Sequence, residues 1–188
     1  MDRDVIAAVD LVFLVGWIVF WVLWLAARFT AKSTVTWNRD HVGFRLLIAV
    51  VVVLLLRSNV FNLRSGVVTD PLLQGMGIAV FVLGLAGAAW ARVYLGRNWG
   101  MPMTERADPE LITSGPYRYV RHPIYTAIIV AMVGTAIGVG LFWLVPAVAA
   151  AAYFIYSAGV EEKTMSRRFP DAYPAYKRNT KMLIPFLL

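Results

Sequence analysis

The feature that most restricts the fold of this chain is a long stretch, from Pro123 to Val160, that contains no charged side chain. One helix over this whole stretch would be far too long for a bilayer core of about 30 Å at 1.5 Å of rise per residue. Two spans that fold back on each other fit the length, and Gly138 and Gly140 permit the turn between them. The sequence therefore predicts a transmembrane hairpin whose two ends meet at one face of the membrane.

The remaining sequence also has the composition of a helical membrane protein. Hydrophobic residues make up 60% of the 188 residues, which exceeds the roughly half that is usual in soluble domains. The segments 5–27 and 71–91 are each long enough to cross a bilayer. A weaker span lies between Arg45 and Arg57 or continues to Leu63. We therefore expect an all-α integral membrane protein with about five transmembrane helices.

This pattern divides the chain into two parts. Residues 1–91 hold the first three spans, and residues 92–188 form a core of a polar loop, the hairpin at 123–160 and a C-terminal tail. Gly77 and Gly84 fall on one face of the third span, which is typical of close helix packing.

The distribution of basic residues predicts the orientation. Five spans with the C-terminus inside place most of the 18 lysines and arginines on the inner side, as the positive-inside rule requires. We expect a bacterial inner-membrane protein with its N-terminus outside and its polar loop and tail in the cytosol. The net charge of +7 is then explained by anionic lipid head groups rather than by nucleic acid.

The composition also excludes several kinds of site. The chain has no cysteine, so disulfides, thiolate nucleophiles and cysteine-based metal sites are absent. We expect no metal cofactor and no nucleic-acid partner.

Charged residues concentrate at the two ends of the predicted hairpin. Arg118, Arg121 and His122 precede it, and Pro123 favours a helix start directly after His122. Free backbone N–H groups at such a helix start attract an anion. Glu161 and Glu162 follow the hairpin, so its closure would bring acidic and basic groups together.

Such a site suits a zwitterionic ligand that carries an amine and a carboxylate, such as the methionine part of S-adenosylmethionine. The alternative is that Arg118 and Arg121 only anchor the chain to head groups, while Glu161 and Glu162 begin a solvated helix.

Several motifs in the second half resemble the isoprenylcysteine carboxyl methyltransferase family and the related bacterial phospholipid N-methyltransferases. They are Leu111 to Tyr125, Gly134, Glu161-Glu162, Phe169, Tyr173, Tyr176 and Ile184-Pro185. The resemblance implies S-adenosylmethionine bound between the Arg-His-Pro-x-Tyr segment, the glutamate pair and the cytosolic tail, with a lipophilic acceptor entering from the bilayer. The cofactor-binding residues expected on this basis are Tyr117, Arg118, His122, Tyr125, Glu161 and Glu162. The residues expected to serve the chemistry are His122, Arg121 and Arg167.

Two departures from the family pattern affect the choice of acceptor. The stretch from Tyr156 to Val160 lacks the arginine that the family commonly has before the glutamate pair, and Thr126 to Ile128 lacks the family's glycine. A carboxylate acceptor held by Arg167 or Arg168 remains our expectation. Prenylated cysteine, a terpenoid acid, a fatty acid and an aminophospholipid all stay open, and an amine or hydroxyl acceptor would need His122 or a glutamate as base.

Two other classes of function compete with methyl transfer. Membrane sterol-type reductases that use NADPH share Arg-His-Pro-x-Tyr, but their pattern continues with Asn-Tyr-x-Gly-Glu where this chain has Ile124 to Ile128. A non-catalytic scaffold or small transporter would predict polar residues at mid-membrane or an internal repeat, and neither is evident. A soluble type of methyltransferase would need alternating strands and helices with a glycine-rich loop, which the sequence lacks.

Overall fold

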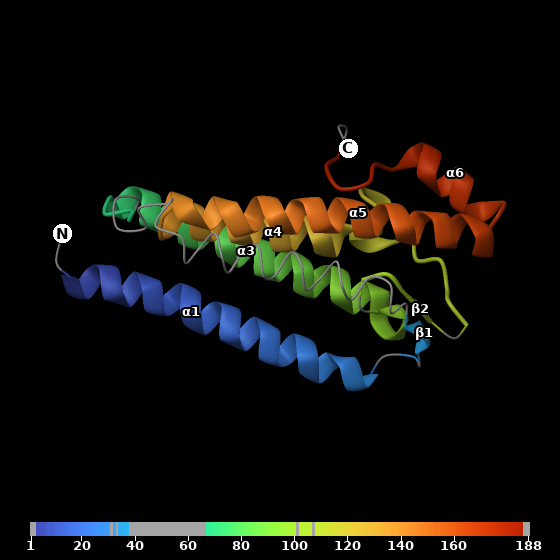
Figure 1. Ribbon diagram of the computed structural model, residues 1–188, viewed down its shortest axis with the longest axis horizontal. Coiled ribbons are helices and arrows are strands. Elements are labelled where there is room, and N and C mark those ends of the chain that lie inside the picture. Colours follow the sequence, from blue (N-terminus) through green and yellow to red (C-terminus); the bar gives the residue numbers. More distant parts are fainter. Residues whose placement is uncertain are drawn as a thin grey trace.

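The computed structural model describes residues 3–30, 32, 34–37, 67–100, 102–106 and 108–185 (Figure 1). Its helices and strands follow in the order α1 (Arg3–Ala26), β1 (Thr34–Trp37), α3 (Pro71–Leu95), β2 (Thr104–Arg106), α4 (Pro123–Gly138), α5 (Leu144–Arg168) and α6 (Ala172–Asn179). The second span expected between Arg45 and Leu63 lies outside the described residues.

The prediction of an all-α membrane protein is confirmed. In the described part of the chain, α1, α3 and α5 are long and apolar enough to cross a bilayer, and α4 is a shorter apolar helix. The predicted hairpin is also present, because α4 ends at Gly138 and α5 begins at Leu144 after a short 3₁₀ turn. α5 continues past the charge-free stretch to Arg168 and ends there.

Glycines allow α3 and α4 to touch backbone to backbone. A Cβ atom added to Gly84 would lie 2.5 Å from the backbone nitrogen of Ala131, and one added to Gly134 would lie 2.4 Å from that of Phe81. Neither contact tolerates a side chain, so the small residues bring the two helix backbones close together. The close packing predicted for the glycine face of the third span is confirmed.

α1 lies along one side of the bundle (Figure 1) and is held there by a few specific contacts. The indole N–H of Trp17 donates to Thr135 Oγ1 of α4 at 3.2 Å. The ring of Trp17 also meets that of Phe81 of α3 edge to face, with centroids 5.4 Å apart. At the other end, Arg92 Nη2 donates to the carbonyl of Ala27 at 2.9 Å. These contacts fix the C-terminal half of α1 relative to α3 and α4.

The loop between α3 and α4 is tied to the segment that follows α1. β1 and β2 form a short antiparallel pair, which the sequence did not predict. Lys32 Nζ lies 2.7 Å from Glu110 Oε1 and 2.7 Å from the carbonyl of Asp108. This loop, the start of α4, the end of α5 and α6 therefore gather at one end of the molecule.

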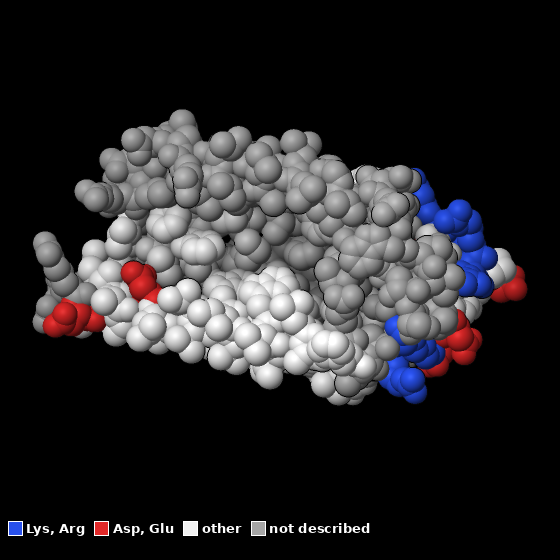
Figure 2. All heavy atoms as spheres, turned by 60° about the horizontal axis from the view of Figure 1, so that its bottom comes forward, with Lys and Arg blue, Asp and Glu red and all other residues white. Residues whose placement is uncertain are grey.

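Basic side chains gather at that same end. On the face shown in Figure 2, the described lysines and arginines lie at one end of the molecule together with some acidic side chains, and the coloured side chains at the opposite end are acidic. This separation fits the predicted orientation, with the basic end in the cytosol.

Candidate active site

The hairpin brings the two separated charged segments together. His122, the residue before α4, places its Nδ1 3.5 Å from Glu161 Oε2 and its Nε2 3.7 Å from Glu162 Oε1 of α5. Two consecutive residues of a helix point in different directions, so the two glutamates have different surroundings.

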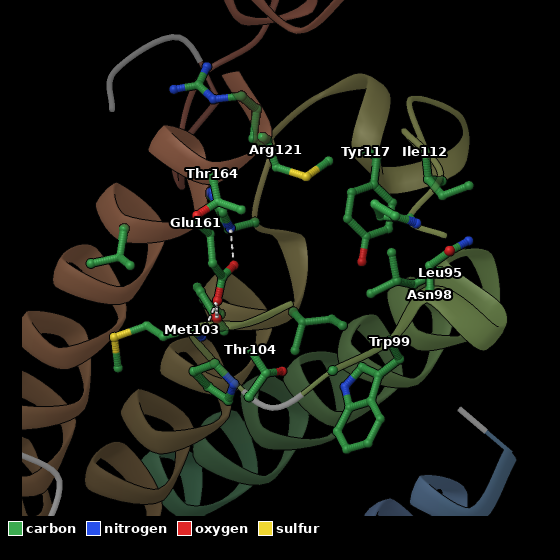
Figure 3. Close-up of a pocket in the computed structure, with 18 of the residues that line it drawn as sticks. Leu95, Asn98, Trp99, Met103, Thr104, Ile112, Tyr117, Arg121, Glu161 and Thr164 are labelled. Carbon is green, nitrogen blue, oxygen red and sulfur yellow. Dashed lines mark hydrogen bonds and ion pairs between the residues drawn. The ribbon is translucent and has the colours of Figure 1, made fainter. Parts of the chain in front are cut away.

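Glu161 faces a pocket (Figure 3). Its Oε1 accepts two hydrogen bonds, one from the hydroxyl of Tyr125 at 2.5 Å and one from the backbone N–H of Met103 at 2.9 Å. The Glu161 side chain remains 27% exposed. Its negative charge is therefore held in a fixed position and is accessible to a ligand.

Glu162 instead joins the hairpin to the C-terminal segment. Its Oε1 lies 2.6 Å from Arg121 Nε, and its Oε2 lies 2.6 Å from Lys177 Nζ of α6. Arg121 Nη1 donates in turn to the carbonyls of Lys177 and Thr180. Glu162 is buried and is not among the residues that line the pocket.

Backbone hydrogen bonds add to this connection. The N–H of Arg121 donates to the carbonyl of Lys181 at 2.8 Å, and the N–H of His122 donates to that of Met182 at 3.0 Å. The sequence had indicated free N–H groups near His122 that would attract an anion. These two N–H groups are not available for that purpose, because the C-terminal segment uses both.

His122 has the surroundings of an imidazolium. Burial by itself lowers the pKa of His122, but the nearby carboxylates of Glu161 and Glu162 outweigh burial, and the pKa lies above its ordinary value. Its Nε2 is buried and finds no hydrogen-bond partner among the residues that the structure describes. The ring stacks on that of Tyr125, with centroids 5.4 Å apart and 3° between the planes. The arrangement favours a protonated ring.

The pocket has a volume of about 530 Å³, within the range of roughly 300–1,000 Å³ that is usual for small-molecule sites. Of the residues proposed from the sequence, seven line it, and they include both arginines considered for the acceptor: Tyr117, Arg121, His122, Tyr125, Glu161, Arg167 and Arg168. Arg118 does not line it, since its guanidinium lies over the ring of Tyr119, 4.9 Å from the centroid.

Two tyrosines of α6 complete the polar end of the pocket. Tyr173 and Tyr176 both line it, and the hydroxyl of Tyr176 donates to the carbonyl of Tyr117 at 2.6 Å. Burial raises the pKa of Tyr176 to about 12 and also raises that of Tyr117, so both phenols stay neutral near pH 7. The sequence had singled out Tyr173 and Tyr176 only as parts of the family pattern.

Other lining residues gave no usable signal in the sequence. Met103 and Trp99 come from the loop after α3, and Trp24 comes from α1. They reach the pocket through tertiary packing, which no local pattern encodes.

The described residues that line the pocket suit an organic ligand. In the part of the chain that the structure describes, no group of three or more His, Asp or Glu side chains could hold a metal. A cation-attracting carboxylate, neutral phenols and aromatic rings do surround the pocket, and they fit a ligand with a positive charge and a flat ring system. S-adenosylmethionine has both features.

The fold and the site together are those of an all-α membrane protein with a ligand-sized pocket at its basic end, and comparison with known proteins gives the family. The phospholipid methyltransferase family matches residues 73–172. The chain belongs to this family of membrane methyltransferases. The match contains α4, α5 and all but the first two residues of α3, whereas α1 and most of α6 lie outside it.

Three curated proteins show the range of its relatives. The chain is 33% identical over 112 residues to the nickel-cobalt-cadmium resistance protein NccN of Alcaligenes xylosoxydans xylosoxydans, covering 58% of this chain and 51% of that protein. It is 28% identical over 142 residues to the cobalt-zinc-cadmium resistance protein CzcN of Cupriavidus metallidurans, covering 73% and 62%. It is 35% identical over 91 residues to methanethiol S-methyltransferase 1 of Bradyrhizobium diazoefficiens, covering 44% and 28%. The matched region is therefore less than two thirds of each relative.

Proposed function

We propose that this protein transfers a methyl group from S-adenosylmethionine to a lipophilic acceptor at the cytosolic face of a bacterial inner membrane. The observation that carries the proposal is the position of Glu161. This carboxylate is fixed by Tyr125 and Met103 at the polar end of a ligand-sized pocket, in a chain that belongs to a methyltransferase family.

Residues around this end would hold the methyl donor. The Glu161 carboxylate attracts a positively charged group, and the rings of Tyr117, Tyr173 and Tyr176 offer flat surfaces for a cation or a heteroaromatic ring. Bound S-adenosylmethionine supplies an electrophilic methyl group on a sulfonium. The protein's task is then to orient this group and to keep water out of the pocket.

The arrangement of acid and base groups favours an acceptor that is already ionised. His122 lies between two carboxylates that favour its protonated form, and Glu161 already accepts two hydrogen bonds. Neither is prepared to remove a proton from an amine or a hydroxyl. An anionic acceptor needs no base, and alignment of the reactants can then provide about 7–11 kcal/mol of the rate enhancement.

Arg167 and Arg168 give such an acceptor a favourable electrostatic environment. Both arginines line the pocket, and Arg167 Nη2 also contacts Thr164 Oγ1 at 3.3 Å. Guanidinium groups bind carboxylates through paired hydrogen bonds. We therefore propose a carboxylate acceptor, with a thiolate as the second candidate because one relative is named a methanethiol S-methyltransferase.

Thermal unfolding of the detergent-solubilised protein tests the proposal. S-adenosylmethionine or S-adenosylhomocysteine at about 100 times its dissociation constant should stabilise the protein by about 2.7 kcal/mol. Glu161→Gln should remove this stabilisation. Arg118→Ala should keep it, because Arg118 lies over Tyr119 and not in the pocket.

Two outcomes would contradict the proposal. Stabilisation by NADPH alone would indicate a reductase. No stabilisation by any of these ligands would favour a non-catalytic membrane protein.

A further inference from the structure

α1 contributes one wall of the pocket although it lies outside the part of the chain that matches the family. Trp21, Trp24 and Leu25 all line the pocket, whereas the family match begins at residue 73. Trp24 meets Trp99 edge to face, with ring centroids 5.6 Å apart, and Trp99 is buried. α1 and the loop after α3 therefore build this wall together.

The α1 wall differs chemically from the end that holds Glu161. In Figure 3, Glu161 and Thr164 lie on one side of the pocket, and Leu95 and Trp99 lie on the other, where α1 runs. The described side chains of this wall are mostly apolar: Trp21, Trp24, Leu25, Leu95, Trp99 and Ile112.

The polar exceptions on this side pair with one another. Glu110 accepts from Lys32, and its backbone N–H donates to Asn98 Oδ1 at 3.2 Å. They lie at an exposed rim and leave the apolar surface of the wall free of an unpaired charge.

Contacts along α1 show that the wall is held in a defined place. A Cβ atom on Gly16 would lie 2.5 Å from the ring of Phe81, so the absence of a side chain lets α1 approach α3 closely. The bond from Trp17 to Thr135 and the bond from Arg92 to Ala27 fix α1 on either side of Trp24. Trp24 itself packs in the same apolar cluster as Trp99.

We infer that α1 binds the hydrocarbon part of the acceptor and thereby selects which acceptors are methylated. This inference rests on the proposed function. The ligand class is an alkyl or isoprenyl chain that carries the reacting carboxylate or thiolate at its end. The hydrocarbon chain of the acceptor lies against Trp24 and continues along α1, where the side chains of Trp21 and Leu25 are 45% and 57% exposed.

The separation of the two surfaces in the sequence has a functional consequence. The donor end is built mainly from residues inside the family match, namely Tyr117, Arg121, His122, Tyr125 and Glu161, whereas the acceptor wall draws on α1. Members of the family can therefore share the donor end and differ in acceptor.

Methyl-transfer kinetics with matched probes test the inference. The assay follows transfer from labelled S-adenosylmethionine to palmitate and acetate, and to dodecanethiol and methanethiol, so that each pair shares a reacting group and differs in chain. The wild-type protein should prefer the long-chain member of whichever pair it methylates. Trp24→Ala and Leu25→Ala should raise KM for that probe by roughly tenfold or more, with kcat and the Kd for S-adenosylhomocysteine unchanged.

Two control variants distinguish a binding wall from general damage to the helix. Leu23→Ala in α1 and Trp90→Ala in α3 remove exposed side chains that do not line the pocket, and both should leave KM unchanged. The inference is overturned if Trp24→Ala and Leu25→Ala leave the KM for the long-chain probe within about twofold of the wild type. It is also overturned if the wild-type protein binds S-adenosylhomocysteine but shows no preference for, or no transfer to, a long-chain probe. Failure to bind S-adenosylhomocysteine at all would instead refute the proposed function.

Discussion

Replacement of Glu162 by alanine would remove the carboxylate that joins the hairpin to the C-terminal segment. The side chains of Glu162 and Arg121 are only 4% and 7% exposed, whereas that of Lys177 is 50% exposed. In Glu162→Ala the guanidinium of Arg121 would stay buried without its counter-ion, and Lys177 would turn to solvent. Loss of the contact with Arg121 and loss of the contact with Lys177 should therefore differ greatly in their cost to stability.

The expected magnitudes follow from this difference in burial. Loss of one partner from a buried ion pair costs about 3–5 kcal/mol, because the other charge is left uncompensated. Loss of a partly exposed ion pair costs about 0–1 kcal/mol. Glu162→Ala should thus destabilise the protein by about 3 kcal/mol, the lower end of the range, because Arg121 keeps its bonds to the carbonyls of Lys177 and Thr180. Lys177→Met should cost under about 1 kcal/mol.

Unfolding in detergent measures these losses, and amide hydrogen exchange over residues 172–183 locates them. Glu162→Ala should speed exchange in this segment, whereas Lys177→Met should change it little. The double variant Arg121→Met with Glu162→Leu should be less destabilised than the sum of the single variants. Equal losses in Glu162→Ala and Lys177→Met, or unchanged exchange over residues 172–183, would refute this account of Glu162.

Three further predictions follow from the site and the packing. The pKa of His122 is raised in the folded protein, so the stability that His122 contributes is complete below the unfolded pKa of about 6.5 and is lost as pH rises through the folded pKa. Unfolding midpoints measured across this pH range should show the fall in stability. A fall of equal size in the His122→Gln variant would contradict this prediction. Gly84→Ala should lower the free energy of unfolding by roughly 1–3 kcal/mol because the added Cβ would collide with the α4 backbone. Gly75→Ala should not destabilise the protein, because a Cβ added there meets nothing within 4 Å. Equal melting temperatures for the two variants would argue against close packing of α3 on α4. Tyr125→Phe should keep the fold and weaken S-adenosylhomocysteine binding, since only the hydroxyl on Glu161 is lost; an unchanged Kd by titration would exclude that role.

The architecture of the hairpin could be predicted from the sequence because its signals are local. A stretch without charge from Pro123 to Val160 permits only membrane or core environments, and Gly138 marks the end of α4 as expected. The glycine face of α3 could also be predicted, because helical periodicity alone places Gly77 and Gly84 on one side of the helix. Both inferences depend on residues that are close in sequence.

The partners of the charged residues could not be predicted, because they depend on packing between distant segments. The sequence treats Arg118 and Arg121 alike, yet Arg118 lies over Tyr119 while Arg121 reaches Glu162, 41 positions away. The bond from the Met103 N–H to Glu161 spans 58 positions. Which of these two arginines, and which of the adjacent Glu161 and Glu162, lines the pocket is decided by the packing of segments that are distant in the sequence.

The most direct test of the central claim is an experimental structure of the protein with S-adenosylhomocysteine bound in a membrane mimetic. Our account predicts density for the ligand in the pocket between α5 and the loop after α3, with its amine next to Glu161 and with Glu162 still paired to Arg121. Ligand density elsewhere, or a ligand amine held by Glu162 in place of Arg121, would contradict the account.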